Sequence, residues 1–212
     1  MPLKTADVIA TLNDPVALGI MFIAGPTFVS GVGYVVVRDS ILNGNIMVLE
    51  GDPQQNLAFY NPSTDTLTTQ GTANPPAGMD DRAQLLHECT HALIDINGPV
   101  GMTRHLGELT AYIAQFVYET RSDPWWTVPP NNVPWQTFYQ GIVDLIHAKN
   151  LHKLEGNGAI LTAAELEPLR LQLIALPGVT YGTYGKDVLA GADGVDRTLW
   201  ERMMRKAASG LS

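Results

Sequence analysis

The sequence has a single cysteine, Cys89, and few basic residues. One cysteine excludes an intrachain disulfide framework and is typical of a reducing compartment. The 13 lysines and arginines are outnumbered by 21 aspartates and glutamates, which gives a formal net charge of −8, and the basic residues form no cluster along the chain. Because a protein must concentrate positive charge to bind a phosphate backbone, we expect no nucleic-acid partner.

Long apolar runs are also missing. The longest run, residues 16–24, is much shorter than the roughly 20 residues that span a bilayer, so we expect no membrane span. Asn13, Asp14 and Pro15 interrupt the apolar run that a Sec signal peptide would need. We therefore expect a protein that is cytoplasmic, or one that is exported by a route without a Sec signal peptide.

The composition favours one globular domain. A chain of 212 residues with 45% apolar and 16% charged residues can bury one substantial core, which predicts a single domain over residues 1–212. The chain contains no internal repeat and no low-complexity segment. The Gly31-Val32-Gly33 segment lacks the remaining glycine and the helix start of a nucleotide-binding loop, so we expect no nucleotide cofactor.

Residues 1–80 are predicted to form a small, mostly antiparallel sheet. Aliphatic and β-branched runs at 17–25, 27–40 and 45–52 are separated by glycine, proline, asparagine and aspartate breaks, which is typical of strands and turns. A Pro-Ser-Thr-Asp turn follows, and it predicts a hairpin with strands near 57–60 and 66–69.

Residues 81–121 are predicted to form two helices. The first begins near Arg82, after a capping aspartate, and stops at Gly98-Pro99. The second begins at Thr103 and cannot pass Pro124 unbroken.

The remaining residues, 122–212, are predicted to be mostly helical. One helix is expected over 136–149, a second after a capping box made by Thr162 and Glu165, and a last one over 198–207. The predicted fold class is therefore α+β, with the sheet first and the helices after it.

The segment AQLLHECTHALIDIN, residues 83–97, places His87, Glu88 and His91 inside a mainly apolar stretch. His87 and His91 are four residues apart, so on a helix they lie on one face and can present two imidazole nitrogens to one metal ion. Glu88 flanks that face, where its carboxylate can take a proton from a water beside the metal. This is the HExxH pattern, in which two neutral nitrogen ligands suit zinc and the glutamate is the general base.

An amphipathic helix that carries two histidines on its polar side is the alternative interpretation of this segment. The apolar residues argue against it, because Leu86, Cys89, Leu93 and Ile96 recur at steps of three and four and predict a core seam beside the histidines. Cys89 is about 200° round the helix from His87, so we expect it to be a small core residue and not a metal ligand.

A catalytic zinc site needs a third protein ligand and one open position. The glycine and histidine that continue the metzincin motif are absent from HALIDINGPV, so that subclass is excluded. The second helix offers His105, Glu108 and Glu119. Glu119 lies about 16 Å further along the helix than Glu108, so both cannot bind one ion. Gly107 and Ala111 would allow the helix to approach the first one closely near Glu108.

Taken together, LLHECTHALIDI at 85–96 and GELTAY at 107–112 resemble the gluzincin branch of the zincin metallopeptidases. In that branch HExxH lies on one helix and a ligand glutamate lies on the next. The resemblance covers residues 57–118. One departure is that several gluzincins have an aspartate four residues after the ligand glutamate to orient the first histidine, and here Tyr112 takes that position.

The resemblance implies a zincin-like domain that hydrolyses peptide bonds in a peptide or protein substrate with a Zn²⁺ cofactor. An edge strand of the sheet would bind the extended substrate by main-chain hydrogen bonds. The implied metal ligands are His87, His91 and Glu108, and the implied general base is Glu88. A zincin-fold binding or scaffold module without turnover, with or without zinc, is the alternative function, and a closed four-ligand site that includes His105 would favour it.

Amide hydrolysis also needs a donor that stabilises the developing oxyanion. The candidates are Arg104, His105, Tyr181 and Tyr184, of which the two tyrosines lie in a glycine-rich loop. The tryptophans of the proline-rich stretch after 122 are expected to pack over the helices behind them. His147 and His152 are five residues apart, which is not the spacing of a chelating pair on a helix, so a second metal site is not expected.

Overall fold

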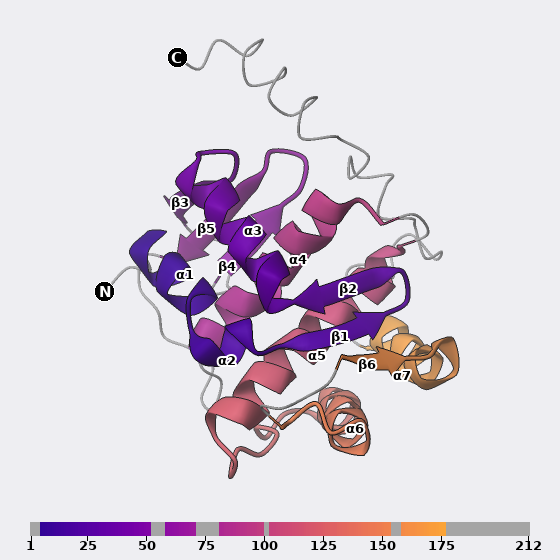
Figure 1. Ribbon diagram of the computed structural model, residues 1–212. Coiled ribbons are helices and arrows are strands. Elements are labelled where there is room, and N and C mark those ends of the chain that lie inside the picture. The colour runs from indigo at the N-terminus through magenta and orange to yellow at the C-terminus, as the bar shows by residue number, and fades with distance from the viewer. Residues whose placement is uncertain (1–4, 52–57, 71–80, 100–101, 154–157, 177–212) are drawn as a thin grey trace.

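The computed structural model describes residues 5–51, 58–70, 81–99, 102–153 and 158–176 (Figure 1). This part of the chain has the α+β architecture, with packed helices and two small mixed sheets. The helices are α1 (Thr5–Leu12), α2 (Pro15–Leu18), α3 (Gly31–Leu42), α4 (Asp81–Asn97), α5 (Arg104–Ser122), α6 (Val133–Ala148) and α7 (Ala163–Ala175). The strands are β1 (Met21–Ala24), β2 (Thr27–Ser30), β3 (Met47–Gly51), β4 (Ala58–Asn61), β5 (Thr66–Gln70) and β6 (Ala159–Leu161).

The N-terminal region contains helices that the sequence prediction missed. The expected strand over 27–40 is wrong, because only β2 is extended and α3 follows it directly. The Ser30 side chain accepts a hydrogen bond from the Gly33 amide at 3.2 Å and so caps α3. A Cβ atom at Gly31 would stand 1.9 Å from the Leu18 carbonyl oxygen, so only glycine allows this approach. Tertiary packing therefore overrides the β propensity of the valines that follow.

The strands form two separate sheets, and the expected single, mostly antiparallel sheet is wrong. The first has the order β2-β1-β6, in which β1 is antiparallel to β2 and parallel to β6. The second has the order β3-β5-β4, in which β5 is parallel to β3 and antiparallel to β4. The β4-β5 pair is the predicted hairpin, which is confirmed. Residues 122–212 were expected to be mostly helical, and their described part contains α6 and α7, but it also contributes β6, which completes the first sheet.

Arg121 joins distant parts of the chain. Its buried guanidinium donates to the Gly19 carbonyl at 2.6 Å and to the Leu151 carbonyl at 2.7 Å. These carbonyls lie just after the ends of α2 and α6, where helix dipoles favour a positive charge. The segments 5–51 and 102–153 are thus tied together at the C-terminal end of α5.

The two helices predicted over residues 81–121 agree with the prediction. α4 and α5 lie side by side at the centre of the molecule (Figure 1). Three residues of the predicted core seam of α4 are buried, with Leu86 and Cys89 at 0% and Leu93 at 1% exposure, and the fourth, Ile96, is partly buried. Thr103 caps α5 by accepting from the Leu106 amide at 3.3 Å. The capping box before α7 is also confirmed, and the helix expected over 198–207 lies outside the described residues.

None of the helices in the described ranges combines the length and apolar character needed to cross a bilayer.

Candidate metal centre

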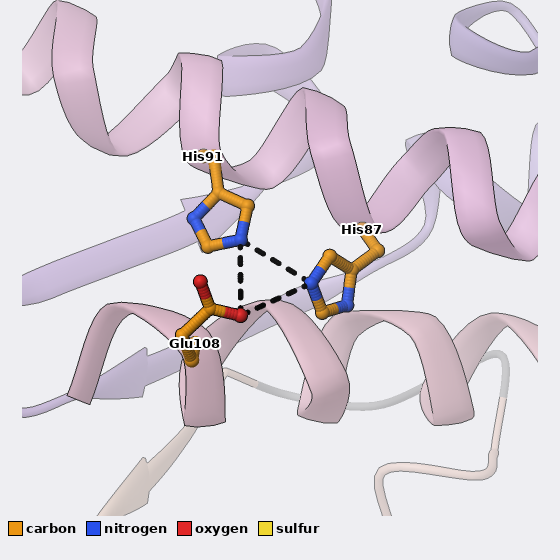
Figure 2. Close-up of side chains that lie close together, drawn as sticks. All are labelled: His87, His91 and Glu108. Carbon is orange, nitrogen blue, oxygen red and sulfur yellow. Dashed lines mark hydrogen bonds and ion pairs between the residues drawn. The ribbon is translucent and has the colours of Figure 1, made fainter. Parts of the chain in front are cut away.

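Three side chains from α4 and α5 converge on one point. Figure 2 shows His87 and His91 projecting from α4 toward Glu108 on α5. The two Nε2 atoms are 3.2 Å apart, and each is 3.5 Å from Oε2 of Glu108. In the described part of the chain these residues form the one group of histidine, cysteine and carboxylate side chains whose atoms are placed to hold a metal ion. The structure thus brings together the three residues that the sequence singles out as ligands.

The spacing of these donor atoms fits a tetrahedral metal ion. Bonds from zinc to nitrogen or oxygen ligands are about 2.0–2.2 Å long, so two donors at tetrahedral angles are about 3.3–3.6 Å apart. The observed separations of 3.2, 3.5 and 3.5 Å lie close to this range. Two imidazoles and one carboxylate are also a donor set that zinc accepts, and they leave a fourth position for water or substrate.

His87 is fixed by contacts on both sides of its ring. Its Nδ1 atom lies 3.1 Å from Oε1 of Gln115, a buried side chain on α5. An amide oxygen can only accept, so at this distance it can bond Nδ1–H, and that tautomer of His87 leaves the Nε2 lone pair free to bind a metal ion. The Tyr112 ring packs edge-on against the imidazole, with the ring centroids 4.6 Å apart.

The charges of the ligand group are strongly coupled. Burial lowers the pKa of His91, but the Glu108 and Glu88 carboxylates together raise it, and the net value is about 9. Burial raises the pKa of Glu108, while His91 and His87 lower it, and the net result is a pKa well below the usual range. In the metal-free protein the pair therefore stands as an imidazolium and a carboxylate at neutral pH.

Glu88 is held beside this group by the edge strand β4. Its Oε2 atom accepts a hydrogen bond from the Tyr60 main-chain N–H at 2.8 Å. Burial raises its pKa, although His87, His91 and the Tyr60 N–H oppose that change. The hydroxyl of Tyr60 donates to Oδ2 of Asp95 on α4 at 2.7 Å, which anchors β4 to α4 about two turns beyond Glu88.

The other ligand candidates from the sequence lie elsewhere. His105 and Glu119 are both buried on α5, and neither belongs to the metal-binding group. Arg104 is half-buried at the start of the same helix. Tyr181 and Tyr184, proposed as oxyanion donors, lie outside the described residues.

The aromatic residues after α5 mostly pack, as expected. Trp126 lies 5.3 Å from Phe116, and Trp135 lies 5.3 Å from Tyr139, measured between ring centroids. Trp125 differs, because 89% of its surface is exposed. The Trp135 ring also lies 6.4 Å from Tyr112, so this aromatic cluster continues to the ring that packs on His87.

Sequence reasoning missed Gln115 and Tyr60. A signal for Gln115 was available, because it stands seven residues after Glu108, or two helical turns along the same face. A short connection makes α4 and α5 antiparallel, so a residue further along α5 meets a residue earlier on α4. Tyr60 carried no such signal, because its contact with Glu88 depends on how the hairpin docks against α4.

No protein-family model, curated protein or solved structure matches this chain. The donor atoms of the site themselves indicate its chemistry. Their arrangement can hold a divalent ion in a three-ligand site, with a carboxylate beside it that is not a ligand.

Proposed function

We propose that this protein is a zinc-dependent metallopeptidase of the zincin type. The observation that carries the proposal is the triangle formed by two Nε2 atoms and one carboxylate oxygen, with sides of 3.2, 3.5 and 3.5 Å. His87, His91 and Glu108 would hold the ion. Zinc in such a site supplies Lewis acidity, which polarises a scissile carbonyl and lowers the pKa of an attacking water.

Glu88 supports an enzyme over a purely structural metal site. Its sequence position beside His87 and its bond to the Tyr60 N–H place a half-buried carboxylate next to the ligand group. In the proposed reaction Glu88 takes a proton from the attacking water and passes it to the leaving amine. One carboxylate oxygen stays on the Tyr60 N–H, which leaves the other to exchange the proton.

The position of β4 supports an extended peptide as substrate. β4 stands at one end of the order β3-β5-β4 and packs against α4. The Tyr60 N–H points away from β5, since it bonds Glu88, and by strand periodicity the main-chain groups of Ala58 point the same way. An added peptide strand would pair with the main-chain groups of this edge that Glu88 does not occupy, and would lay its scissile bond beside the metal ligands.

The test uses the purified full chain, its metal content and a mixed peptide library. We expect about one zinc per chain, and cleavage that falls about 10²–10⁴-fold in Glu88→Gln while zinc remains bound. His87→Ala, as the matched variant one residue away, should lose zinc and cleavage together. Equal cleavage by wild type and Glu88→Gln would exclude Glu88 as the base. Zinc binding without cleavage by wild type would instead favour a non-catalytic zincin module.

A further inference from the structure

A buried amide takes the place that a carboxylate often has behind a metal-binding histidine. The side chains of His87 and Gln115 are both nearly inaccessible, with 8% and 3% of the residue surface exposed. Nδ1 and Oε1 are 3.1 Å apart, within the range of a direct hydrogen bond. A buried ring nitrogen without this acceptor would lose a hydrogen bond, so the contact constrains the ring strongly.

We propose that Gln115 is the positioning residue of the metal site, which selects the Nδ1–H tautomer of His87 and aims Nε2 at the ion. The inference rests on the metal site of the proposed function. The neutral imidazole has one ring nitrogen that donates and one that accepts. Accepting from Nδ1–H leaves the Nε2 lone pair directed at the point where His91 and Glu108 converge.

Tyr112 complements this contact without duplicating it. Its ring meets the His87 imidazole at an interplanar angle of 71°, so it restricts how the imidazole tilts. Packing of this kind does not distinguish one ring nitrogen from the other. Gln115 therefore selects the tautomer of His87, and Tyr112 restricts the tilt of its ring.

Because Gln115 is neutral, it adds no negative charge near the metal ion. A carboxylate behind the histidine would add a second negative charge near the ion and make the imidazole more basic. With an amide there, Glu108 contributes the single negative charge of the ligand set. The bound ion then retains more of its positive charge, which favours Lewis acidity over the tightest metal binding.

The decisive variants are Gln115→Met, which keeps length but removes the acceptor, and Gln115→Glu, which restores an acceptor. Thr120→Val is the matched control, because Thr120 is buried on the same helix and its hydroxyl bonds the Phe116 carbonyl at 2.8 Å. Zinc affinity should fall about 10–100-fold in Gln115→Met, remain near wild type in Thr120→Val, and equal or exceed wild type in Gln115→Glu, because the added negative charge favours the ion. Thermal unfolding of each metal-free variant separates a loss of fold from a loss of positioning.

A second readout does not need metal or activity. Nitrogen-15 spectra of the histidine rings in metal-free protein should show His87 protonated at Nδ1 in wild type and a mixture of tautomers in Gln115→Met. Unchanged zinc affinity and an unchanged tautomer in a folded Gln115→Met would overturn the inference and leave the proposed function intact. Zinc binding with these differences but without peptide cleavage would overturn only the proposed function. A wild-type chain that binds no zinc would overturn both.

Discussion

The two parts of the molecule that meet at the site hold their functional side chains in different ways. α4 and α5 place His87, His91 and Glu108 through helix periodicity and a buried helix-helix contact. The N-terminal part contributes the hairpin β4-β5, which holds Glu88 through a single main-chain N–H. Metal binding should therefore depend on the helix pair alone, whereas turnover should depend on both parts.

The strongest test of the helix pair is removal of the ligand from α5. Loss of a residue that hydrogen-bonds a metal ligand lowers metal affinity about 10–100-fold. Glu108→Ala should lower zinc affinity by more than this, because it deletes one of the three ligands themselves. Zinc titration of wild type and variant measures this effect. Glu119→Gln is the matched control, since Glu119 is buried on the same helix outside the metal-binding group. A loss confined to His105→Ala would instead indicate a three-histidine site.

The coupled charges predict that zinc binding depends on pH. The pKa of His91 is about 9 in the metal-free protein, so at pH 7 this ring must lose a proton before its nitrogen can bind the ion. Apparent zinc affinity should rise about tenfold per pH unit between about pH 7 and 9 and then level off. Calorimetry in buffers of different ionisation enthalpy should show about one proton released at pH 7. Proton release near zero would contradict the pairing of His91 with Glu108.

The same pair affects the stability of the metal-free protein. The pKa of His91 is raised in the folded state. Its contribution to the free energy of unfolding is therefore complete below the unfolded pKa of 6.5 and is lost as the pH rises toward about 9. Glu108 has a lowered pKa, so its contribution is present above 4.5 and is lost at lower pH. The free energy of unfolding, measured in denaturant, should therefore include the largest contribution of this pair between pH 4.5 and pH 6.5. Bound zinc should remove the loss of stability that the metal-free protein shows as the pH rises toward about 9.

The difference between the two parts also explains which features could be predicted. Helix periodicity is local, so His87, His91 and the buried seam of Leu86, Cys89 and Leu93 follow from spacing alone. The pairing of β6 with β1 joins residues that are far apart in the chain, and no local pattern encodes it. α3 was missed for a related reason, because the close approach of Gly31 to the Leu18 carbonyl at the start of this helix is a tertiary contact.

The smallest expected effect concerns the anchor of the hairpin. Tyr60→Phe removes the hydroxyl that donates to Asp95, which loosens β4 against α4 but leaves the main-chain N–H on Glu88. Zinc content should stay at the wild-type level, because no ligand is touched. A 1 Å misplacement of a reacting group costs about 10²-fold in rate. The cleavage rate of Tyr60→Phe should fall by less than this, about tenfold.

Tyr34→Phe is the matched control for this variant. Its hydroxyl lies 2.9 Å from Oγ1 of Thr90, so it also joins an N-terminal element to α4, but it does so through α3 and not beside Glu88. Loss of this neutral bond should lower the free energy of unfolding by about 0.5–1.5 kcal/mol, against about 1.5–3 kcal/mol for the bond from Tyr60 to a carboxylate. Cleavage by Tyr34→Phe should be unchanged. If both variants slow cleavage equally, the general stability of α4 controls turnover, and the hairpin has no special part in holding Glu88.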